Sequence, residues 1–389
     1  LSSTTGAATY TFGATSGTID TIIATWTTVK YTITFNANGG NAVASKTYTI
    51  ETDTFTLATT TRTGYVFAGW KVTAISGTAM ANKVAVAVGN IISQIDKGSY
   101  ANITVEAQWT ANSYKVAYNG NGATDGATAT SDHTYDVVKA LTSNGFVRNY
   151  IVTYNYNGAT GNNTKANDVA KYTFAGWTGA TAGKYGTSSS TVTNNASGAT
   201  LPNGAYILNL ATTGTVTLSA KWNAVSISLP QPEKTGYTFA GWYLDNKFTN
   251  KVENNYTPAA DVTLYAKWTA NEFTIDYENI NANSVAQIEN LASLPRKYTY
   301  GQSQTLVSAT SKNYTFDGWY LDKAKTTKVG LQLTSAQTQV VGGITLYANW
   351  TYTIVFNTNA PAGTTVTGVA NKGMNSGDSY TIAEKLTLN

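Results

Sequence analysis

The sequence contains no cysteine and a single histidine, His133, and these shortages exclude whole classes of chemistry. Without cysteine the chain can build neither a disulfide framework nor a thiolate nucleophile. One histidine is also too few ligands for a zinc site. The Gly-rich stretch from Asn119 to Gly126 holds one carboxylate, whereas calcium needs several clustered oxygen ligands, so we interpret it as a hairpin loop. We therefore predict no metal ion and no cofactor.

Charge is scarce as well. Charged residues make up 12% of the chain, about half of the usual quarter, and the net charge is +4. No run of lysine or arginine occurs, so we expect no nucleic-acid partner. No apolar stretch approaches the roughly 20 residues that span a bilayer, so we expect no membrane span. Thr, Asn, Gly, Ala and Tyr are abundant instead, which favours strands and tight turns over helices.

The nine tryptophans reveal an internal repeat, because each lies in one of two contexts. The first context, here called the central motif, is Tyr-x-Phe-x-Gly-Trp, at residues 65–70, 172–177, 237–242 and 314–319. The second is a closing strand that ends in tryptophan, at residues 103–109, 216–222, 262–268 and 344–350, with a weaker copy at 20–26. The repeat therefore organises nearly the whole chain.

A third element, the opening strand, begins each repeat and is followed by an Asn-rich turn. It reads YTITFNANGG from Tyr31 and YIVTYNYNG from Tyr150, and further copies begin at Tyr114, Phe273 and Tyr352. All three elements alternate with period two, which is typical of half-buried antiparallel strands. The Asn-Gly clusters indicate hairpin turns. In the central motif we expect the glycine to shift the phase at a bulge.

Two tryptophans from different strands are expected to meet in one small core in each repeat. Burial of each ring is worth roughly 2–3 kcal/mol. The predicted structural core residues are Trp26, Trp70, Trp109, Trp177, Trp222, Trp242, Trp268, Trp319 and Trp350. The alternative, a platform on which glycans or bases stack, needs exposed aromatic residues outside the repeat. Every tryptophan lies within the repeat, which favours the structural interpretation.

These motifs resemble the Listeria–Bacteroides repeat family, also known from the B repeat of internalins. The matching patterns are the opening Y-x-I/V-x-F/Y-x-x-N-G-G, the central T-G-Y-x-F-A-G-W and the closing L-Y-A-K-W. The resemblance implies a mainly β chain of tandem small β-grasp-like (ubiquitin-like) modules stacked as a rod. It also implies an extracellular or cell-surface bacterial protein that acts as a spacer, adhesin or partner-binding module without catalysis. The opening strand at Phe273 departs from the pattern because it lacks Gly-Gly.

Openings and closings define the expected domains. Residues 1–28 resemble a closing half-repeat, 29–111 a complete module, 112–268 a composite of two repeats, 269–350 a complete module and 351–389 an opening half-repeat. In the composite region two openings precede two closings, so the repeats are either fused or nested, or else two degenerate modules follow in series. The linkers are very short, which favours stiff stacking over flexible tethering.

The two half-repeats suggest assembly between chains. Each half would expose an unpaired strand edge, so one chain could complete the next head to tail and build a filament. The candidate assembly strands contain Ile22, Trp26, Tyr352, Ile354 and Phe356. A filament subunit is thus one predicted function, and an adhesin stalk or binding module is the other. A third interpretation is that the sequence boundaries cut a longer repeat array.

Catalytic patterns are not evident in the sequence. His133 lies between Asp132 and Asp136, but no nucleophile elbow accompanies it, and acids adjacent in sequence are common. The acids that could be considered for glycoside cleavage, Asp245, Glu253, Asp261 and Asp322, fall mostly in turns after the central motifs. No motif for a lysine isopeptide bond stands out either. We predict that the chain is not an enzyme.

Overall fold

The computed structural model describes residues 17, 26–76, 87–161, 165–280, 286–312, 314–354, 362 and 372–375. These residues are mainly β: the one helical element among them is the 3₁₀ turn η1 (Leu291–Ser293). No helix in the described ranges has the length and apolar character needed to cross a membrane. By internal contacts the chain divides into unit 1 (Leu1–Asn149 with Tyr172–Ala224) and unit 2 (Tyr150–Lys171 with Val225–Asn389).

The first module, residues 31–111, is built on a five-stranded sheet. Its strands are β1 (Tyr31–Asn36), β2 (Lys46–Tyr48), β4 (Tyr65–Ser76), β5 (Ile91–Ile92) and β7 (Asn102–Ala111), in the order β2-β1-β7-β4-β5. The opening strand β1 is antiparallel to β2 but parallel to the closing strand β7. The central-motif strand β4 is antiparallel to β7. Period-two alternation predicted antiparallel strands. This prediction is wrong for the opening–closing pair. Alternation indicates only that a strand is half-buried, and a strand in a parallel pair can be half-buried as well.

Module 2, in unit 1, comprises residues 113–149 and 172–224. Its main sheet contains β8 (Ser113–Asn119), β10 (Ser131–Thr134), β15 (Thr173–Thr178) and β19 (Gly214–Asn223), in the order β10-β8-β19-β15. The opening strand β8 is parallel to the closing strand β19 and antiparallel to β10.

Module 3, in unit 2, comprises residues 150–171 and 225–270. Its main sheet contains β13 (Asn149–Asn155), β14 (Asn167–Lys171), β21 (Tyr237–Tyr243) and β23 (Val262–Ala270), in the order β14-β13-β23-β21. Opening strand β13 is again parallel to closing strand β23.

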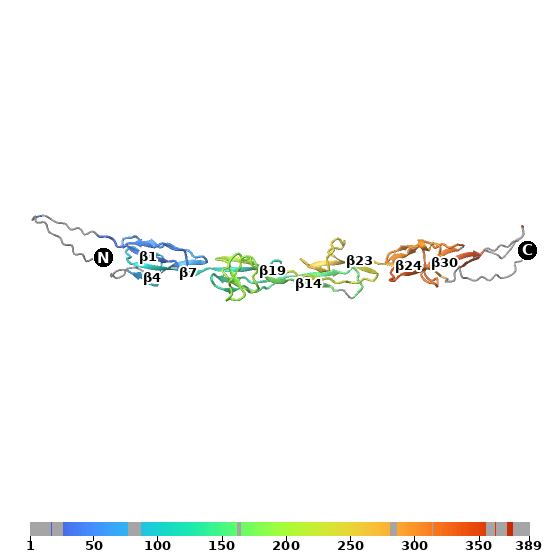
Figure 1. Ribbon diagram of the computed structural model, residues 1–389, viewed down its shortest axis with the longest axis horizontal. Helices are drawn as coiled ribbons and strands as arrows, with labels where there is room; N and C mark the ends of the chain where they lie inside the picture. Colours follow the sequence, from blue (N-terminus) through green and yellow to red (C-terminus); the bar gives the residue numbers. More distant parts are fainter. Residues whose placement is uncertain are drawn as a thin grey trace. The chain divides into compact units, whose positions relative to one another are not determined.

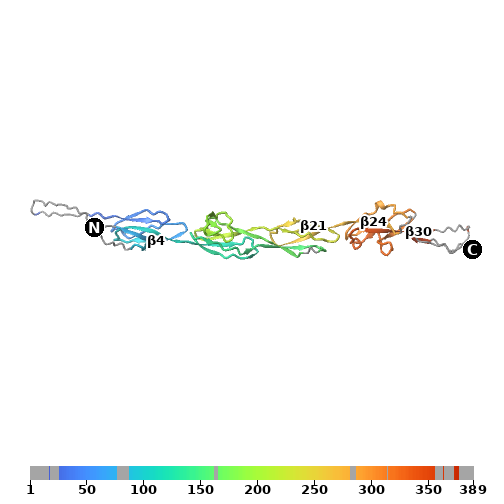
Figure 2. The same cartoon turned by 60° about the horizontal axis from the view of Figure 1, so that its bottom comes forward.

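Module 4, residues 272–350, has the same plan in unit 2. Its strands are β24 (Glu272–Asn279), β25 (Lys297–Thr299), β27 (Thr315–Tyr320), β28 (Lys328–Val329) and β30 (Ile344–Ile354), in the order β25-β24-β30-β27-β28, and β31 (Lys372–Asn375) also pairs with β30. Figure 1 and Figure 2 show β24 and β30 side by side although the colour bar places them far apart in the sequence.

Short strands complete the modules in small sheets. They are β3 (Phe55–Thr56), β6 (Gln94–Ile95), β9 (Asp125–Gly126), β11 (Lys139–Ala140), β12 (Phe146–Val147), β16 (Lys184–Gly186), β17 (Asn194–Asn195), β18 (Tyr206–Leu208), β20 (Ile227–Ser228), β22 (Asn255–Tyr256), β26 (Gln304–Thr305) and β29 (Gln332–Leu333).

The strand pairing resolves the composite region at 112–268. The first opening strand, β8, pairs with the first closing strand, β19, although β13 and β14 lie between them in sequence. The second opening strand, β13, pairs with the second closing strand, β23. The two repeats are therefore interleaved, which is a form of fusion that differs from both nesting and a series. Sequence patterns identify openings and closings but do not say which opening pairs with which closing.

Each module surrounds a pair of tryptophans with one phenylalanine between them. In module 1, Phe67 meets Trp70 edge to face at 5.3 Å between ring centroids and Trp109 at 5.5 Å. The same trio recurs with Phe174, Phe239 and Phe316 in modules 2, 3 and 4. The central-motif tryptophans and Trp350 are fully buried, whereas Trp109, Trp222 and Trp268 are partly buried against the cores.

The central-motif glycine lies at a bulge in every module, as predicted. The register between the central and closing strands shifts between the phenylalanine and this glycine each time. Gly69 has φ +122° and Gly318 has φ +151°, values that side-chain-bearing residues rarely adopt. Because the bulge adds one residue, Phe67 and Trp70 both point into the core although they are three positions apart.

In most of the buried or partly buried tryptophans the indole N–H group donates a hydrogen bond to a particular loop or turn. Trp222 donates to the carbonyl oxygen of Gly120 and Trp268 to that of Tyr156, both in the turn after an opening strand. Trp70 donates to the carbonyl oxygen of Ala58, in the loop between β3 and β4, at 2.8 Å. A buried polar group without a partner costs free energy, so these bonds select one packing of each ring. The buried Nε1 of Trp177 has no partner among the described residues.

The prediction that Trp26 is a core residue is wrong, because Trp26 is 78% exposed. In the complete modules a closing tryptophan is covered by the turn after an opening strand and by the phenylalanine of a central motif. No described residue supplies either to Trp26. The remainder of the expected closing half-repeat, residues 1–28, lies largely outside the described residues, as does most of the opening half-repeat at 351–389.

Candidate functional site: module junctions and the terminal edge

At the junction between modules 1 and 2, the ring of Tyr135 from module 2 packs against Gly64 of module 1. We call this packing site the glycine seat. Asn112 is the single residue between β7 and β8, and its N–H donates to the carbonyl of Gly64 at 2.9 Å. The N–H of Tyr135 donates in turn to the carbonyl of Asn112 at 2.9 Å. The ring of Tyr135 then meets Tyr65 edge to face, with 5.7 Å between centroids and 75° between planes.

The junction between modules 3 and 4 repeats this construction. Asn271 separates β23 from β24, donates to the carbonyl of Gly236 at 2.9 Å and accepts from the N–H of Tyr300 at 2.9 Å. The rings of Tyr237 and Tyr300 lie 5.6 Å apart at 74°. Two separate places in the chain thus converge on one geometry.

Glycine is required in both seats. Gly64 has φ +80° and Gly236 has φ +78°, in the left-handed region that favours glycine. A Cβ at Gly64 would lie 2.3 Å from the Tyr135 ring, and one at Gly236 would lie 2.4 Å from the Tyr300 ring. The glycine therefore supplies both the backbone conformation and the space that the ring occupies.

Polar contacts distinguish the two junctions. In unit 1, the hydroxyl of Tyr65 donates to Asp136 at 2.6 Å, and Asn209 donates its amide N–H to the same carboxylate at 2.6 Å. The hydrogen bond from Tyr65, followed by that from Asn209, lowers the pKa of Asp136, and the same contact raises the pKa of Tyr65. In unit 2 the position after Tyr300 is Gly301, so no carboxylate is present there.

A cation covers the tyrosine of each seat. The guanidinium of Arg62 lies 4.0 Å from the ring centroid of Tyr65, and the ammonium of Lys234 lies 4.6 Å from that of Tyr237. Such cation–π contacts at exposed sites contribute about 0.5–1 kcal/mol. Each of these tyrosines thus contacts both a cation and the ring of the next module.

A shallow polar hollow accompanies the first seat, with a volume of about 440 Å³ between Arg62, Tyr65 and Asp136. A comparable hollow of about 490 Å³ lies beside Lys234, Tyr237 and Trp268 in module 3. The described residues contain no group of three or more His, Asp or Glu side chains placed to hold a metal ion.

The end of β30 forms the start of another opening hairpin. Tyr352 pairs with Met374 of β31, as Tyr31 pairs with Tyr48 and Phe273 with Tyr298 in complete modules. In complete modules the other edge of the opening strand carries a parallel closing strand, and no described residue pairs with that edge at 352–354. Ile354 is in β30, whereas the other candidate assembly residues, Ile22 and Phe356, lie outside the described residues.

His133 is placed as a core residue. It pairs with Tyr114 across β10 and β8, its ring stacks on Tyr114 at 5.5 Å, and its Nε2 lies 2.8 Å from the hydroxyl of Ser131. Its buried Nδ1 has no described partner, and burial lowers its pKa to about 4. Asp132 instead pairs with Lys115, and Asp136 belongs to the junction, so these residues do not form a relay.

Three of the four acids considered above for glycoside cleavage accept hydrogen bonds from backbone N–H groups. Asp245 accepts hydrogen bonds from the backbone N–H groups of Lys247, Thr249 and Asn250. Asp322 binds the backbone of Thr326 and Thr327 in the matching turn of module 4, and Asp261 accepts from the N–H of Ile151. These bonds hold loops and bring no pair of carboxylates together.

The sheets, the tryptophan cores and the repeated junctions define a mainly β protein built from tandem repeats. The sequence profile of the Listeria–Bacteroides repeat domain matches residues 31–92, 203–267 and 273–349, which together exceed half of the chain. The chain belongs to the Listeria–Bacteroides repeat family. The second matched range runs through the closing part of module 2 into module 3.

Two relatives illustrate where such repeats occur. A protein of Evansella cellulosilytica named as a Gly-rich membrane protein is 27% identical over 330 residues, covering 77% of this chain and 32% of the relative. Internalin H of Listeria monocytogenes is 34% identical over 140 residues, covering 35% of this chain and 23% of the relative. The chain therefore spans a third or less of the length of either relative.

Proposed function

We propose that this chain is a load-bearing spacer of a bacterial cell-surface protein, built from β-grasp-like modules stacked as a rod. The observation that carries the proposal is the parallel pairing of the first and last main strands in every module. In module 1 the register runs from Ile33 opposite Ile103 to Asn36 opposite Glu106.

Parallel pairing determines how a pulling force is borne. The chain enters module 1 at the start of β1 and leaves it at the end of β7. Because the two strands are parallel, these two points lie at opposite ends of the shared ladder. A pull along the chain therefore loads the ladder hydrogen bonds together in shear, rather than one after another. Forced unfolding depends on the unfolding barrier, and shear raises that barrier.

The junctions support a stiff connection. Each linker is a single asparagine, Asn112 or Asn271, whose backbone bonds both to the preceding module's glycine and to the following module's tyrosine. A linker fixed at both sides has little of the freedom of a Gly/Ser-rich tether. Force would then pass between modules without slack.

The β-grasp-like assignment is supported by the sheet order, in which the first and last strands are central neighbours. The described residues depart from a ubiquitin-like fold in lacking an α-helix across the sheet, since η1 is a single 3₁₀ turn. A surface location is supported by the names of the relatives, a membrane protein and an internalin. A role without catalysis is supported by the use of His133 and the turn acids in packing and loop bonding.

The test uses the absence of cysteine, which lets two engineered thiols serve as unique attachment points. Pulling between Lys30→Cys and Thr110→Cys loads module 1 in shear. The matched control pulls between Thr32→Cys and Asn102→Cys, which lie side by side because the Thr32 N–H donates to the Asn102 side chain at 2.8 Å. We expect a several-fold higher unfolding force for the first pair. Equal forces in optical-tweezer or atomic-force traces would refute the load-bearing role.

A filament subunit is the second candidate function. It is favoured by the opening hairpin of β30 and β31 and by the exposure of Trp26. In that case the strand containing Trp26 would pair in parallel with residues 352–354 of another copy. Electron microscopy and light scattering of the purified chain test this candidate. Fibres that vanish in a chain lacking residues 351–389 would support it, and a monomer at all concentrations would eliminate it while leaving the spacer proposal intact.

A further inference from the structure

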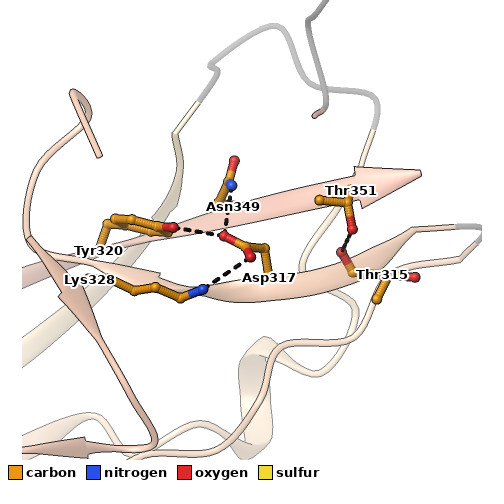
Figure 3. Close-up of polar contacts among 6 residues, drawn as sticks. All are labelled: Thr315, Asp317, Tyr320, Lys328, Asn349 and Thr351. Atoms are coloured by element: carbon orange, nitrogen blue, oxygen red, sulfur yellow. Dashed lines mark hydrogen bonds and ion pairs between the residues drawn. The ribbon is translucent and has the colours of Figure 1, made fainter. Parts of the chain in front are cut away.

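Module 4 contains a polar cluster around Asp317, at a position where the other modules have Ala68, Ala175 and Ala240. Asp317, in the bulge of β27, accepts a hydrogen bond from Nζ of Lys328 at 3.0 Å through Oδ1. Its Oδ2 accepts from Nδ2 of Asn349 at 3.0 Å and from the hydroxyl of Tyr320 at 2.7 Å. Figure 3 shows the carboxylate between the lysine and the amide, which come from strands on opposite sides of β27.

The glycine of the central motif brings these side chains together. Gly318 is paired with Asn349, and Lys328 on β28 is paired with Tyr320, two residues further along β27. A Cβ at Gly318 would lie 2.6 Å from Cε of Lys328. The lysine therefore reaches across the space that the missing side chain leaves open, toward the strand that carries Asn349.

Burial gives the three groups different environments. Asn349 is 4% exposed, so its amide is shielded from water, and Tyr320 is also buried. The side chain of Lys328 is half-exposed, and its Nζ lies on the Asp317 carboxylate that also contacts the amide. An amine, a shielded amide and a carboxylate that touches both are the components of an acyl-transfer site.

We propose that Lys328 and Asn349 become joined by an intramolecular isopeptide bond, with Asp317 as the catalytic proton carrier. The neutral amine of Lys328 attacks Cγ of Asn349. Asp317, as the carboxylate, accepts a proton from the attacking nitrogen at Oδ1 and then, as the acid, delivers that same proton to the departing nitrogen. The Nζ–Cγ bond forms, the Cγ–Nδ2 bond breaks, and ammonia leaves. The step consumes no oxidant or other co-reactant.

The electrostatics of the cluster set the expected pH dependence. Hydrogen bonding to Asp317 raises the pKa of Lys328, and hydrogen bonding from Asn349, with further bonds from Tyr320 and Lys328, lowers the pKa of Asp317 to about 2. Asp317 and Tyr320 are the titratable groups that the structure places against Lys328. At neutral pH the unreacted pair is ionic, so reaction requires the ammonium of Lys328 to lose a proton to solvent. The bond should therefore form faster as the pH rises.

Module 3 is a built-in control. Lys251 there occupies the position of Lys328, since it bridges to Tyr243 and lies 2.5 Å from the place of a Cβ at Gly241. However, Ala240 replaces the aspartate, and Lys267 replaces the asparagine opposite the glycine. The lysine is thus retained without a proton carrier or an amide to attack, and we expect no bond there.

The test is the intact mass of the full chain after incubation over a range of alkaline pH. We expect the mass to fall by one molecule of ammonia. Because trypsin does not cleave after a lysine whose Nζ is acylated, the digest should contain residues 326–372 as one looped peptide that lacks one ammonia, with cleavage after Lys251 unaffected. Asp317→Ala should abolish the loss, and Lys328→Arg should abolish it while keeping a cation beside Asp317. An unchanged mass of the unsubstituted chain at every pH would overturn the proposal. A bond that still forms in Asp317→Ala would overturn the role of Asp317.

Discussion

The two junctions share an aromatic seat and differ in the polar contacts around it. In unit 1 the pair of Tyr65 and Tyr135 is surrounded by Asp136 and Asn209, whereas in unit 2 the same ring geometry forms around Tyr237 and Tyr300 without a carboxylate. Centroid distances of 5.7 and 5.6 Å show that the polar bonds are not needed to set the ring geometry. The glycine seat therefore defines the junction, and the charged contacts adjust its stability and pH response.

The largest loss of stability should come from adding a side chain at the two junction glycines. Gly64→Ala and Gly236→Ala each add a Cβ that strikes a tyrosine ring and place a side chain at positive φ, which together should cost about 2–4 kcal/mol. Gly98→Ala is the matched control, because Gly98 has φ +84° but no neighbour within 4 Å of its Cβ position. Thermal unfolding and limited proteolysis near Asn112 or Asn271 measure the loss. An equal effect of all three substitutions would show that backbone strain alone is responsible.

The next largest effect is a loss of stability at acid pH in unit 1 that unit 2 should not show. The pKa of His133 in unit 1 is lowered to about 4 by burial, so the folded state disfavours the proton that the unfolded chain accepts. Its contribution is present above the unfolded pKa of about 6.5 and is lost as the pH falls toward 4, by roughly 1–3 kcal/mol after allowance for solvent screening. Module 4 has Tyr298 at the matching position.

Hydrogen exchange at pH 7 and pH 4 measures this difference for peptides of each unit. We expect β8 and β10 to lose protection at pH 4 while β24 and β25 keep it. His133→Tyr should remove the difference. Equal loss in both units at pH 4, or an acid response that persists in His133→Tyr, would assign the sensitivity to other groups.

A smaller effect should be shared by both junctions. An edge-to-face aromatic pair contributes about 0.5–1.5 kcal/mol beyond area burial. Double-mutant cycles with Phe and Ala substitutions at Tyr65 and Tyr135, and at Tyr237 and Tyr300, should give the same coupling free energy within error. The Tyr→Phe variants keep the rings and remove only the hydroxyls. Coupling confined to unit 1 would mean that the polar contacts, rather than the rings, hold the junction.

The smallest effect should be confined to unit 1. The hydrogen bonds from Tyr65 and Asn209 lower the folded pKa of Asp136, so its contribution is present above the ordinary carboxyl pKa and is lost as the pH falls through the lowered value. Asp136→Asn should slightly weaken the first junction at pH 7 and leave the second unchanged. Chemical-shift titration of Tyr135 and Tyr300 reports both junctions in one sample. A shift of both on substitution would contradict a local role.

The sequence predicts the parts of this fold that repeat and misses those that depend on which parts meet. The paired tryptophans and the bulge at Gly69 and its counterparts follow from spacing alone, because each phenylalanine and tryptophan must face one core. The interleaving of modules 2 and 3 does not follow, since every opening strand is chemically able to pair with every closing strand. The sequence contains one signal for the glycine seats. Of the four central-motif tyrosines, only Tyr65 and Tyr237 directly follow a glycine.

The cluster around Asp317 was equally hidden. A bulge places Asp317 and Gly318 opposite one residue of β30, and only this register brings Lys328 and Asn349 to the same carboxylate. In the sequence, Asp317 is a single-residue difference, YTFDGW in place of the YTFAGW of modules 2 and 3. Asn349 likewise changes LYAKW of module 3 to LYANW. Neither change suggests chemistry until the register is known.

End-to-end extension of the whole chain tests the load-bearing account most directly, with the Thr32 and Asn102 thiol pair as the internal reference for unzipping. If the parallel ladders bear the load, every module resists until a force well above that reference. Modules 2 and 3 should then yield in one event, because the chain passes between them three times. Modules that open one by one at the unzipping force would contradict it.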